Sequence, residues 1–188
     1  MKTVFLDRDG VINYNRENDY VKSWSEFEFL PRSVEAIRLL THAGYQLIVV
    51  TNQACINKKI LSPKTLNEIH RNMLAEIEDI GGRIHAVYYC PHRDDENCMC
   101  RKPKPGMLLQ AASEHKIDIA STYLIGDSNR DIQAGNEFGI CSLLVLTGNG
   151  YKSNLTTNTG AASRMQPQGV FENLHAAAEW IVSSSTDA

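Results

Sequence analysis

The stretch Thr3-Val-Phe-Leu-Asp-Arg-Asp-Gly10 carries a short apolar run directly into two aspartates and a glycine. A run of this length and composition is typical of a buried strand. In extended backbone, side chains two residues apart point to the same side. Asp7 and Asp9 are therefore expected to face one pocket, unless they only cap the turn at Gly10.

The rest of the chain alternates short apolar runs with longer amphipathic stretches. Further strands are predicted at 46–50, 83–89, 122–125 and 142–146, and helices at 33–43, 62–80, 106–116, 129–138 and 170–182. Strands that are apolar on both sides and alternate with helices indicate a parallel sheet covered on both faces. The predicted fold class is α/β, with three layers (α/β/α) around a mostly parallel, Rossmann-like sheet. Residues 148–167 are expected to form a long surface loop.

Composition favours one domain and argues against several functions. With 188 residues, of which 43% are hydrophobic, the chain can bury one sizeable core, so a single domain over residues 1–188 is expected. The net charge of -3 provides no basic field for nucleic acid or an anionic membrane surface. No stretch reaches the roughly 18 apolar residues of a membrane helix, and the first residues do not resemble a secretory signal. We expect a cytoplasmic protein without nucleic-acid or membrane partners.

Three predicted strands end in polar residues, namely Asp7 after Leu6, Thr51-Asn52-Gln53 after Val50, and Gly126-Asp127-Ser128 after Ile125. In sheets of this kind, ligands bind at the carboxyl ends of the strands. The carboxylates of Asp7, Asp9 and Asp127 would repel one another there unless a cation neutralised them. Oxygen ligands that leave room for water and a phosphate oxygen favour Mg2+ over Ca2+.

Two further features suit a phosphate group. Thr51 and Asn52 offer a hydroxyl, an amide and backbone N–H donors in a predicted loop, although such a pair also forms ordinary turns. Lys102 precedes a proline that favours extended backbone, so its ammonium can be held against a phosphoryl group, unless the charged run around it is only a solvated surface. Asp131 is expected to cap the helix that begins at 129.

A second cluster lies at Cys90, His92, Cys98 and Cys100, which place three thiols and one imidazole within eleven residues. The set matches a closed, structural Zn2+ site, with incidental cysteines in a polar loop as the alternative. A metal would hold this short loop, 90–100, so that Arg101 and Lys102 project from a rigid base. The other two cysteines, Cys55 and Cys141, are assigned to packing, and the remaining histidines, including His70, show no ligand spacing.

The chain contains four motifs in the order Asp7-x-Asp9-Gly-Val-Ile, Thr51-Asn52-Gln53, Lys102-Pro and Gly126-Asp127-x-x-x-Asp131. Together they resemble the haloacid dehalogenase superfamily of phosphatases over residues 3–147. The resemblance implies that Asp7 is the nucleophile that forms an aspartyl-phosphate and that Asp9 is the general acid and base. It implies that Thr51 and Lys102 bind the transferred phosphoryl group, and Asn52 and Gln53 are also expected to bind phosphate or substrate. It also implies that Mg2+ is held by Asp7, the Asp9 carbonyl oxygen and Asp127.

The string CPH…CxCRKPKPGM resembles the branch of this superfamily that contains the heptose 1,7-bisphosphate 7-phosphatases and the histidinol-phosphate phosphatases. The chain is more similar to the first group, whose enzymes make precursors of bacterial surface polysaccharide such as lipopolysaccharide. The expected substrate is therefore a small sugar phosphate, with histidinol phosphate as the alternative and a catalytically silent, zinc-stapled binding module as the alternative of another class. Arg101 is expected to recognise the remote part of the substrate. No large cap domain is expected, and a monomer is favoured.

The loop after Gln53 departs from the pattern of that branch, which usually reads Thr-Asn-Gln-Ser/Ala-Gly-Ile-Ala/Gly-Arg-Gly. This chain has Cys55, Lys58 and Lys59 where the pattern has glycine, arginine and glycine. Lysine cannot form the bidentate phosphate fork of arginine, and glycine permits backbone conformations that other residues rarely adopt. Segment 13–31 and the loop after Gln53 are nonetheless expected to line the mouth of the site. Arg101, Lys58 and Lys59 would suit a second phosphate.

Overall fold

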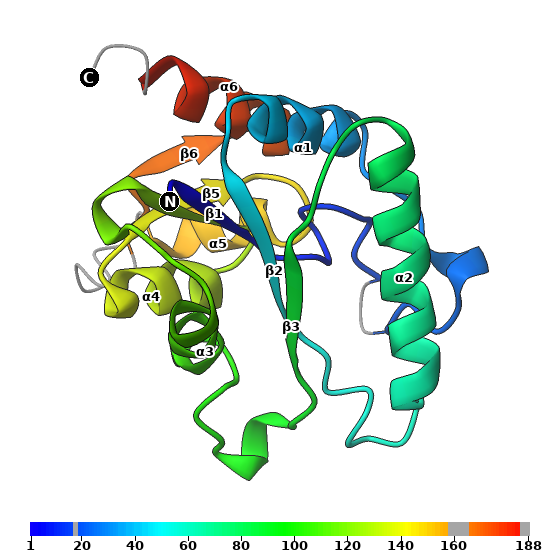
Figure 1. The fold of residues 1–188 in the computed structure, drawn as a ribbon. Helices are drawn as coiled ribbons and strands as arrows, with labels where there is room; N and C mark the ends of the chain where they lie inside the picture. The colour runs from blue at the N-terminus through cyan, green and yellow to red at the C-terminus, as the bar shows by residue number, and fades with distance from the viewer. Residues whose placement is uncertain (17–18, 158–165, 185–188) are drawn as a thin grey trace.

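The structure is a computed structural model that describes residues 1–16, 19–157 and 166–184 (Figure 1). Within these residues the strands are β1 Thr3–Leu6, β2 Gln46–Asn52, β3 Ala86–Cys90, β4 Thr122–Gly126, β5 Cys141–Val145 and β6 Gly169–Phe171. The helices are α1 Ser33–His42, α2 Pro63–Asp79, α3 Gly106–Glu114, α4 Asn129–Phe138, α5 Gly150–Thr157 and α6 Leu174–Ser184. Short 3-10 turns lie at Trp24–Glu26, Asp94–Glu96 and Ile119–Ser121.

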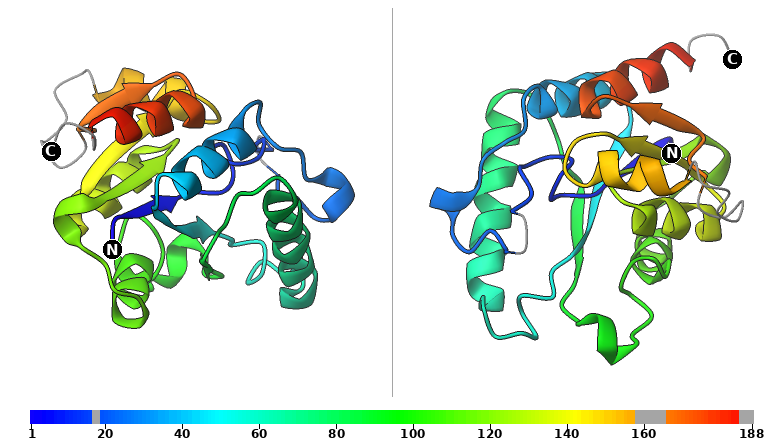
Figure 2. Two further views of the ribbon diagram at one scale, coloured as in Figure 1. Left: turned by 45° about the horizontal axis from the view of Figure 1, so that its top comes forward. Right: turned by 180° about the vertical axis from the view of Figure 1, so that it is seen from behind.

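The described strands form one sheet in the order β3-β2-β1-β4-β5-β6, and every neighbouring pair is parallel. Side chains of the central strands alternate between two cores. Val4 and Leu6 belong to a cluster shared with α1, α2 and α6, whereas Phe5 belongs to a cluster shared with α3 and α4. Helices α1 and α6 lie side by side on one face (Figure 1, Figure 2). The predicted three-layer α/β class is confirmed, and no large cap domain is inserted in the described part of the chain.

Local sequence explains where the helices begin and end. At the start of α2, the Ser62 hydroxyl accepts a hydrogen bond from the Thr65 N–H at 3.1 Å, and Pro63 occupies the first helical position. Helix α4 begins with a reciprocal capping box between Ser128 and Asp131, as expected for Asp131. It ends at Gly139, whose φ of 86° is in the left-handed region.

Several predicted boundaries were wrong. The predicted helix 170–182 begins inside β6, a short strand that pairs with β5, and α6 starts only at Leu174. The predicted loop 148–167 contains α5, and its residues 158–165 lie outside the described residues. Strand β2 continues to Asn52, so Thr51 and Asn52 end a strand and are not in a loop. No helix in the described ranges combines the length and apolar character needed to span a bilayer.

The sheet topology brings the predicted polar strand ends together. Leu6 of β1 pairs with Val49 of β2 and with Ile125 of β4, so the residues that follow emerge at one edge. The chain runs from β1 outward to β2 and β3, then returns to β4 on the other side of β1. This reversal between β1 and β4 is where open α/β sheets bind their ligands.

Candidate active site

A cavity of about 430 Å3 lies at this edge of the sheet. Its lining includes seven residues expected from the sequence, namely Asp7, Asp9, Thr51, Asn52, Arg101, Lys102 and Asp127. Asn15, Arg16, Asp19, Tyr20 and Val21 line it as well, so segment 13–31 borders the cavity as predicted. The described residues of four separate segments therefore meet in one polar pocket.

Lys102 is the buried centre of this pocket. Its ammonium lies 2.9 Å from Asp7 Oδ1, contacts Asp131 Oδ1, and donates to the Val50 carbonyl oxygen at 2.7 Å. Its backbone is also fixed, because the Asn52 amide exchanges two 3.1 Å hydrogen bonds with the Lys102 N–H and C=O. Asn52 therefore positions the lysine in addition to lining the cavity.

Asp7, Asp127 and Asp131 can each bring a carboxylate oxygen within 4.8 Å of the other two. Burial raises the pKa of Asp7 to about 7 even though Lys102 acts in the opposite direction, and burial also raises the pKa of Asp127 well above its ordinary value. Three ionised carboxylates beside one ammonium would leave two negative charges uncompensated. This oxygen-only, anionic donor set fits a hard divalent cation. Asp131, which we had expected only to cap α4, thus also belongs to the carboxylate cluster.

Gly10 makes room for this cluster. Its φ is +88°, a conformation that residues with a side chain rarely adopt, and a Cβ atom there would lie 2.2 Å from Asp127 Oδ2. Asp127 Oδ2 accepts a 2.7 Å hydrogen bond from the Asn149 N–H, which fixes the carboxylate from the other side. The glycine that follows the two aspartates is therefore required by close packing as well as by the turn.

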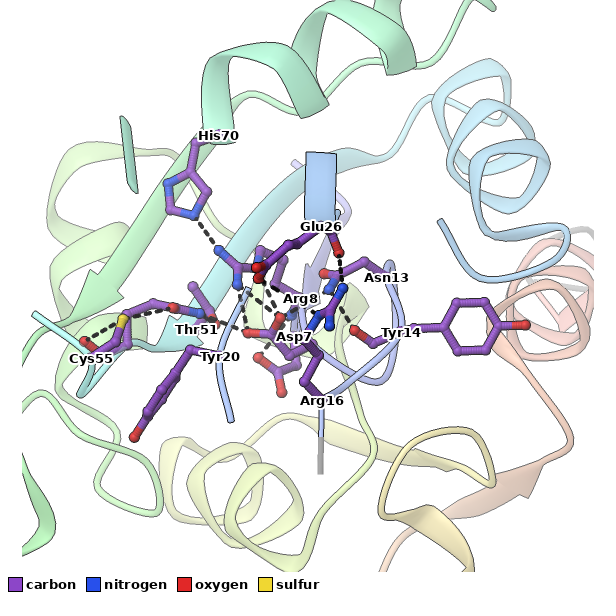
Figure 3. Close-up of polar contacts among 12 residues, drawn as sticks. Asp7, Arg8, Asn13, Tyr14, Arg16, Tyr20, Glu26, Thr51, Cys55 and His70 are labelled. Carbon is purple, nitrogen blue, oxygen red and sulfur yellow. Dashed lines mark hydrogen bonds and ion pairs between the residues drawn. The ribbon is translucent and has the colours of Figure 1, made fainter. Parts of the chain in front are cut away.

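Asp9 lies in a different environment, in which Arg8 is the main partner. The Arg8 guanidinium is 1% exposed and donates to both Asp9 carboxylate oxygens at 2.8 and 2.9 Å. On its other side, Arg8 Nη1 contacts His70 Nε2 of α2 at 3.0 Å (Figure 3). Burial and the neighbouring guanidinium lower the pKa of His70 to about 3, so the neutral imidazole accepts this hydrogen bond.

The amide of Gln53 completes the surroundings of Asp9. It donates to Asp9 Oδ2 at 2.7 Å and to the Thr51 hydroxyl at 2.9 Å. Burial by itself would raise the pKa of Asp9, but the Arg8 charge and these hydrogen bonds lower it overall. Gln53 is 1% exposed and is not among the residues that line the cavity, so its described contacts are those of a residue that positions Asp9 and Thr51.

Arg8 and His70 were missed by the sequence analysis. An arginine between two aspartates reads as a solvated charge, and a single histidine in a helix carries no ligand spacing. The available signal was the apolar run that precedes Arg8, because a strand buried on both faces leaves its next residue little access to solvent.

The cysteine and histidine cluster also assembles. Sγ of Cys90 lies 3.5 Å from His92 Nδ1, 3.6 Å from Cys98 Sγ and 3.3 Å from Cys100 Sγ. Cys100 Sγ lies 3.3 Å from His92 Nδ1 and 3.6 Å from Cys98 Sγ. Bonds of about 2.0–2.3 Å to a central tetrahedral metal give edges of roughly these lengths. These four residues can therefore hold one metal ion.

The loop after Gln53 does not take the expected place. None of its residues lines the cavity among the described residues. Cys55 is fully buried, Lys59 has a φ of 58° at a position where the related pattern has glycine, and Lys58 Nζ lies over the Tyr20 ring at 5.4 Å from its centroid. Lys58 and Lys59 are therefore not among the described lining residues, and their suitability for a second phosphate stays a prediction.

Comparison with known proteins identifies relatives along nearly the whole chain. A protein of Neisseria meningitidis serogroup A named D-glycero-beta-D-manno-heptose-1,7-bisphosphate 7-phosphatase is 44% identical over 153 residues, which are 81% of each chain. The protein of that name from Bordetella bronchiseptica is 38% identical and covers 98% of this chain and 100% of its own. A crystal structure of D,D-heptose 1,7-bisphosphate phosphatase from B. bronchiseptica, complexed with magnesium and phosphate, superposes with a TM-score of 0.89 and covers 98% of this chain and 99% of its own.

Family models agree with these relatives. A model of HAD-like hydrolases matches residues 99–177, and the model of the haloacid dehalogenase-like hydrolases matches residues 12–136, which include most of the lining of the cavity. Together with the fold and the four converging segments, these matches show that the chain belongs to the haloacid dehalogenase-like hydrolase family.

Proposed function

We propose that this protein is a Mg2+-dependent phosphatase that removes the 7-phosphate of D-glycero-D-manno-heptose 1,7-bisphosphate. The single observation that carries the proposal is the buried group of Asp7, Lys102, Asp127 and Asp131 at the switch point of the sheet. The substrate is inferred from relatives with 44% and 38% identity that carry the name of this activity. The magnesium is inferred from the carboxylate set and from the related crystal structure that contains it.

In the proposed first step, an oxygen of Asp7 attacks the phosphorus and the bond from phosphorus to the sugar oxygen breaks. Asp9 gives its proton to the leaving alkoxide, which would otherwise be a poor leaving group. In the second step, Asp9 takes a proton from water, the water oxygen attacks phosphorus, and the bond to Asp7 breaks to release phosphate. Lys102 and the Thr51 hydroxyl bind the phosphoryl oxygens throughout.

The charges of the site agree with this assignment once metal and substrate are considered. Asp7 and Asp127 would hold a divalent cation, whose positive charge would keep both carboxylates ionised. Asp9 must carry a proton to act as the acid, whereas Arg8 favours its ionised form. A phosphate dianion bound beside Asp9 raises the pKa of that carboxyl and opposes the effect of Arg8.

We also propose that Cys90, His92, Cys98 and Cys100 hold a structural Zn2+ ion. The near-tetrahedral spacing of their side-chain atoms supports this, and the set leaves no open coordination position. The ion would fix the loop from which Arg101 and Lys102 emerge.

The test is steady-state hydrolysis of both anomers of heptose 1,7-bisphosphate and of histidinol phosphate, with Mg2+ present. We expect the bisphosphate to be preferred by kcat/KM, and Asp7→Asn to abolish phosphate release while the circular dichroism spectrum is retained. A tenfold preference for histidinol phosphate would refute the substrate assignment, and unchanged turnover by Asp7→Asn would refute the nucleophile.

A further inference from the structure

A second cavity of about 320 Å3 adjoins the active-site cavity. It lies between the loop that carries the cysteine cluster and the start of α4, and it shares Arg101, Lys102 and Arg130 with the first cavity. Among the described residues, five cationic side chains line it, namely Arg93, Arg101, Lys102, Lys104 and Arg130, and Asp94 is the single acidic one. Such a cavity favours an anion.

Asp94 joins two of these cations. Its Oδ1 accepts a hydrogen bond from Arg101 Nε, and its Oδ2 accepts one from Arg130 Nη2 at 3.1 Å. Arg101 Nη1 also donates to the His92 carbonyl oxygen at 3.2 Å, which ties the guanidinium to the cysteine cluster. One carboxylate thus sets the orientation of two guanidinium groups that come from separate segments of the chain.

The two guanidinium groups keep donors for a ligand. A guanidinium carries five N–H donors, and the contacts above use only part of them. Arg130 is 51% exposed and Arg101 is 14% exposed, so the first is open to solvent and the second is held by its surroundings. Arginine is the side chain best suited to a phosphate because its planar fork matches two phosphate oxygens.

We propose that Arg130 determines specificity by binding, together with Arg101, the phosphate of the substrate that is not transferred, while Asp94 positions both guanidinium groups. This inference rests on the proposed function, in which one phosphate of a bisphosphate substrate binds at Asp7 and Lys102 and the other phosphate binds elsewhere. Arg101, Lys102 and Arg130 connect the two cavities, so the second phosphate lies beside these cations when the first is at Asp7. Lys58 and Lys59 do not line either cavity.

The test compares kcat/KM for heptose 1,7-bisphosphate with that for heptose 7-phosphate, which has the same sugar and lacks the second phosphate. In Arg130→Gln, we expect the ratio of the two kcat/KM values to fall about tenfold, which corresponds to about 1.4 kcal/mol. The fall should come chiefly from a higher KM for the bisphosphate. Arg130→Lys keeps the charge without the fork and should restore part of the ratio, which a purely structural arginine would not predict. The matched control is Arg38→Gln, an exposed arginine of α1 outside both cavities, which should leave the ratio at the wild-type value.

The outcomes separate this inference from the function on which it rests. If the wild type hydrolyses the bisphosphate but the kcat/KM ratio in Arg130→Gln is within about twofold of that in Arg38→Gln, the role of Arg130 is overturned. The proposed function would stand in that case. Failure of the wild type to hydrolyse the bisphosphate would refute the proposed function and this inference with it. Arg130 is half exposed, so the variant is expected to fold, and circular dichroism checks that it does.

Discussion

Replacing Lys102 by methionine should destabilise the protein and stop phosphate release. The side chain of Lys102 is 3% exposed, and its ammonium contacts the carboxylates of Asp7 and Asp131 and the carbonyl oxygen of Val50. Methionine fills a similar volume without the charge. The substitution therefore tests the electrostatic contribution of the ammonium with little change in packing.

Removing one partner of a buried ion pair costs about 3–5 kcal/mol, because the remaining charge stays buried without compensation. Two carboxylates lose their partner here, and Asp127 lies in the same cluster. Uptake of a proton by Asp7 limits the loss, since burial already raises the pKa of that carboxyl to about 7. We therefore expect the free energy of unfolding to fall by about 4 kcal/mol in the absence of Mg2+.

The measurement is urea unfolding followed by circular dichroism in buffer with EDTA, alongside phosphate release with Mg2+. Lys104→Met is the matched control, because Lys104 lies two residues away and, within the described part of the chain, donates to the carbonyl and amide oxygens of Asn97 at the surface. That control should change the free energy of unfolding by less than about 1 kcal/mol. A loss below about 1 kcal/mol in Lys102→Met would refute the electrostatic reasoning.

Three further changes test other parts of the site. Mg2+ at about a hundred times its Kd should raise the free energy of unfolding of the wild type by about 2.7 kcal/mol. This increase should disappear in Asp127→Asn. An equal increase in both proteins would exclude Asp127 as a ligand. Purified, reduced protein should contain about one equivalent of zinc that is lost in Cys98→Ser, whereas Cys141→Ser should keep it; wild type without zinc would contradict the metal site. His70→Leu leaves Arg8 Nη1 without its acceptor and should lower the free energy of unfolding by about 1–3 kcal/mol in thermal or urea unfolding. The control His42→Leu, at an exposed position, should lower it by less than about 0.5 kcal/mol. Equal effects of the two substitutions would show that the buried contact contributes nothing.

The sheet could be predicted from the sequence because its central strands are buried on both faces. Apolar residues then follow one another without alternation, as in Leu47 to Val50 of β2, and this pattern is hard to mistake. Strand β6 could not be predicted in the same way. It has three residues, and only its pairing with β5 defines it. Helix α5 likewise lies in a polar stretch that carries no amphipathic pattern.

The candidate site could be predicted where a residue type and its chain position were enough. Asp7 and Asp127 each follow the end of a strand, so the topology alone brings them to one edge. Lys102 was singled out by the proline that follows it, which favours extended backbone. Arg8 could not be found this way, because its buried position depends on a contact with His70, which approaches it from α2. A pattern along the chain reports the neighbours of a residue in sequence, whereas the partners of a buried charge are set by tertiary packing.

Lys58 and Lys59 show the same limit in another loop. A lysine beside a predicted active site reads as a phosphate ligand, but Lys58 Nζ lies over the ring of Tyr20 at the border of the cavity, and neither lysine is among the described lining residues. The cations that do face the cavity include Arg101, at the end of the cysteine-cluster loop, and Arg130 in the first turn of α4. Both are held by Asp94, which no motif singles out. If Arg101 and Arg130 bind the remote phosphate as we propose, selectivity depends on how segment 90–104 packs against α4, so a substitution that loosens this segment should impair selectivity before it impairs phosphoryl transfer.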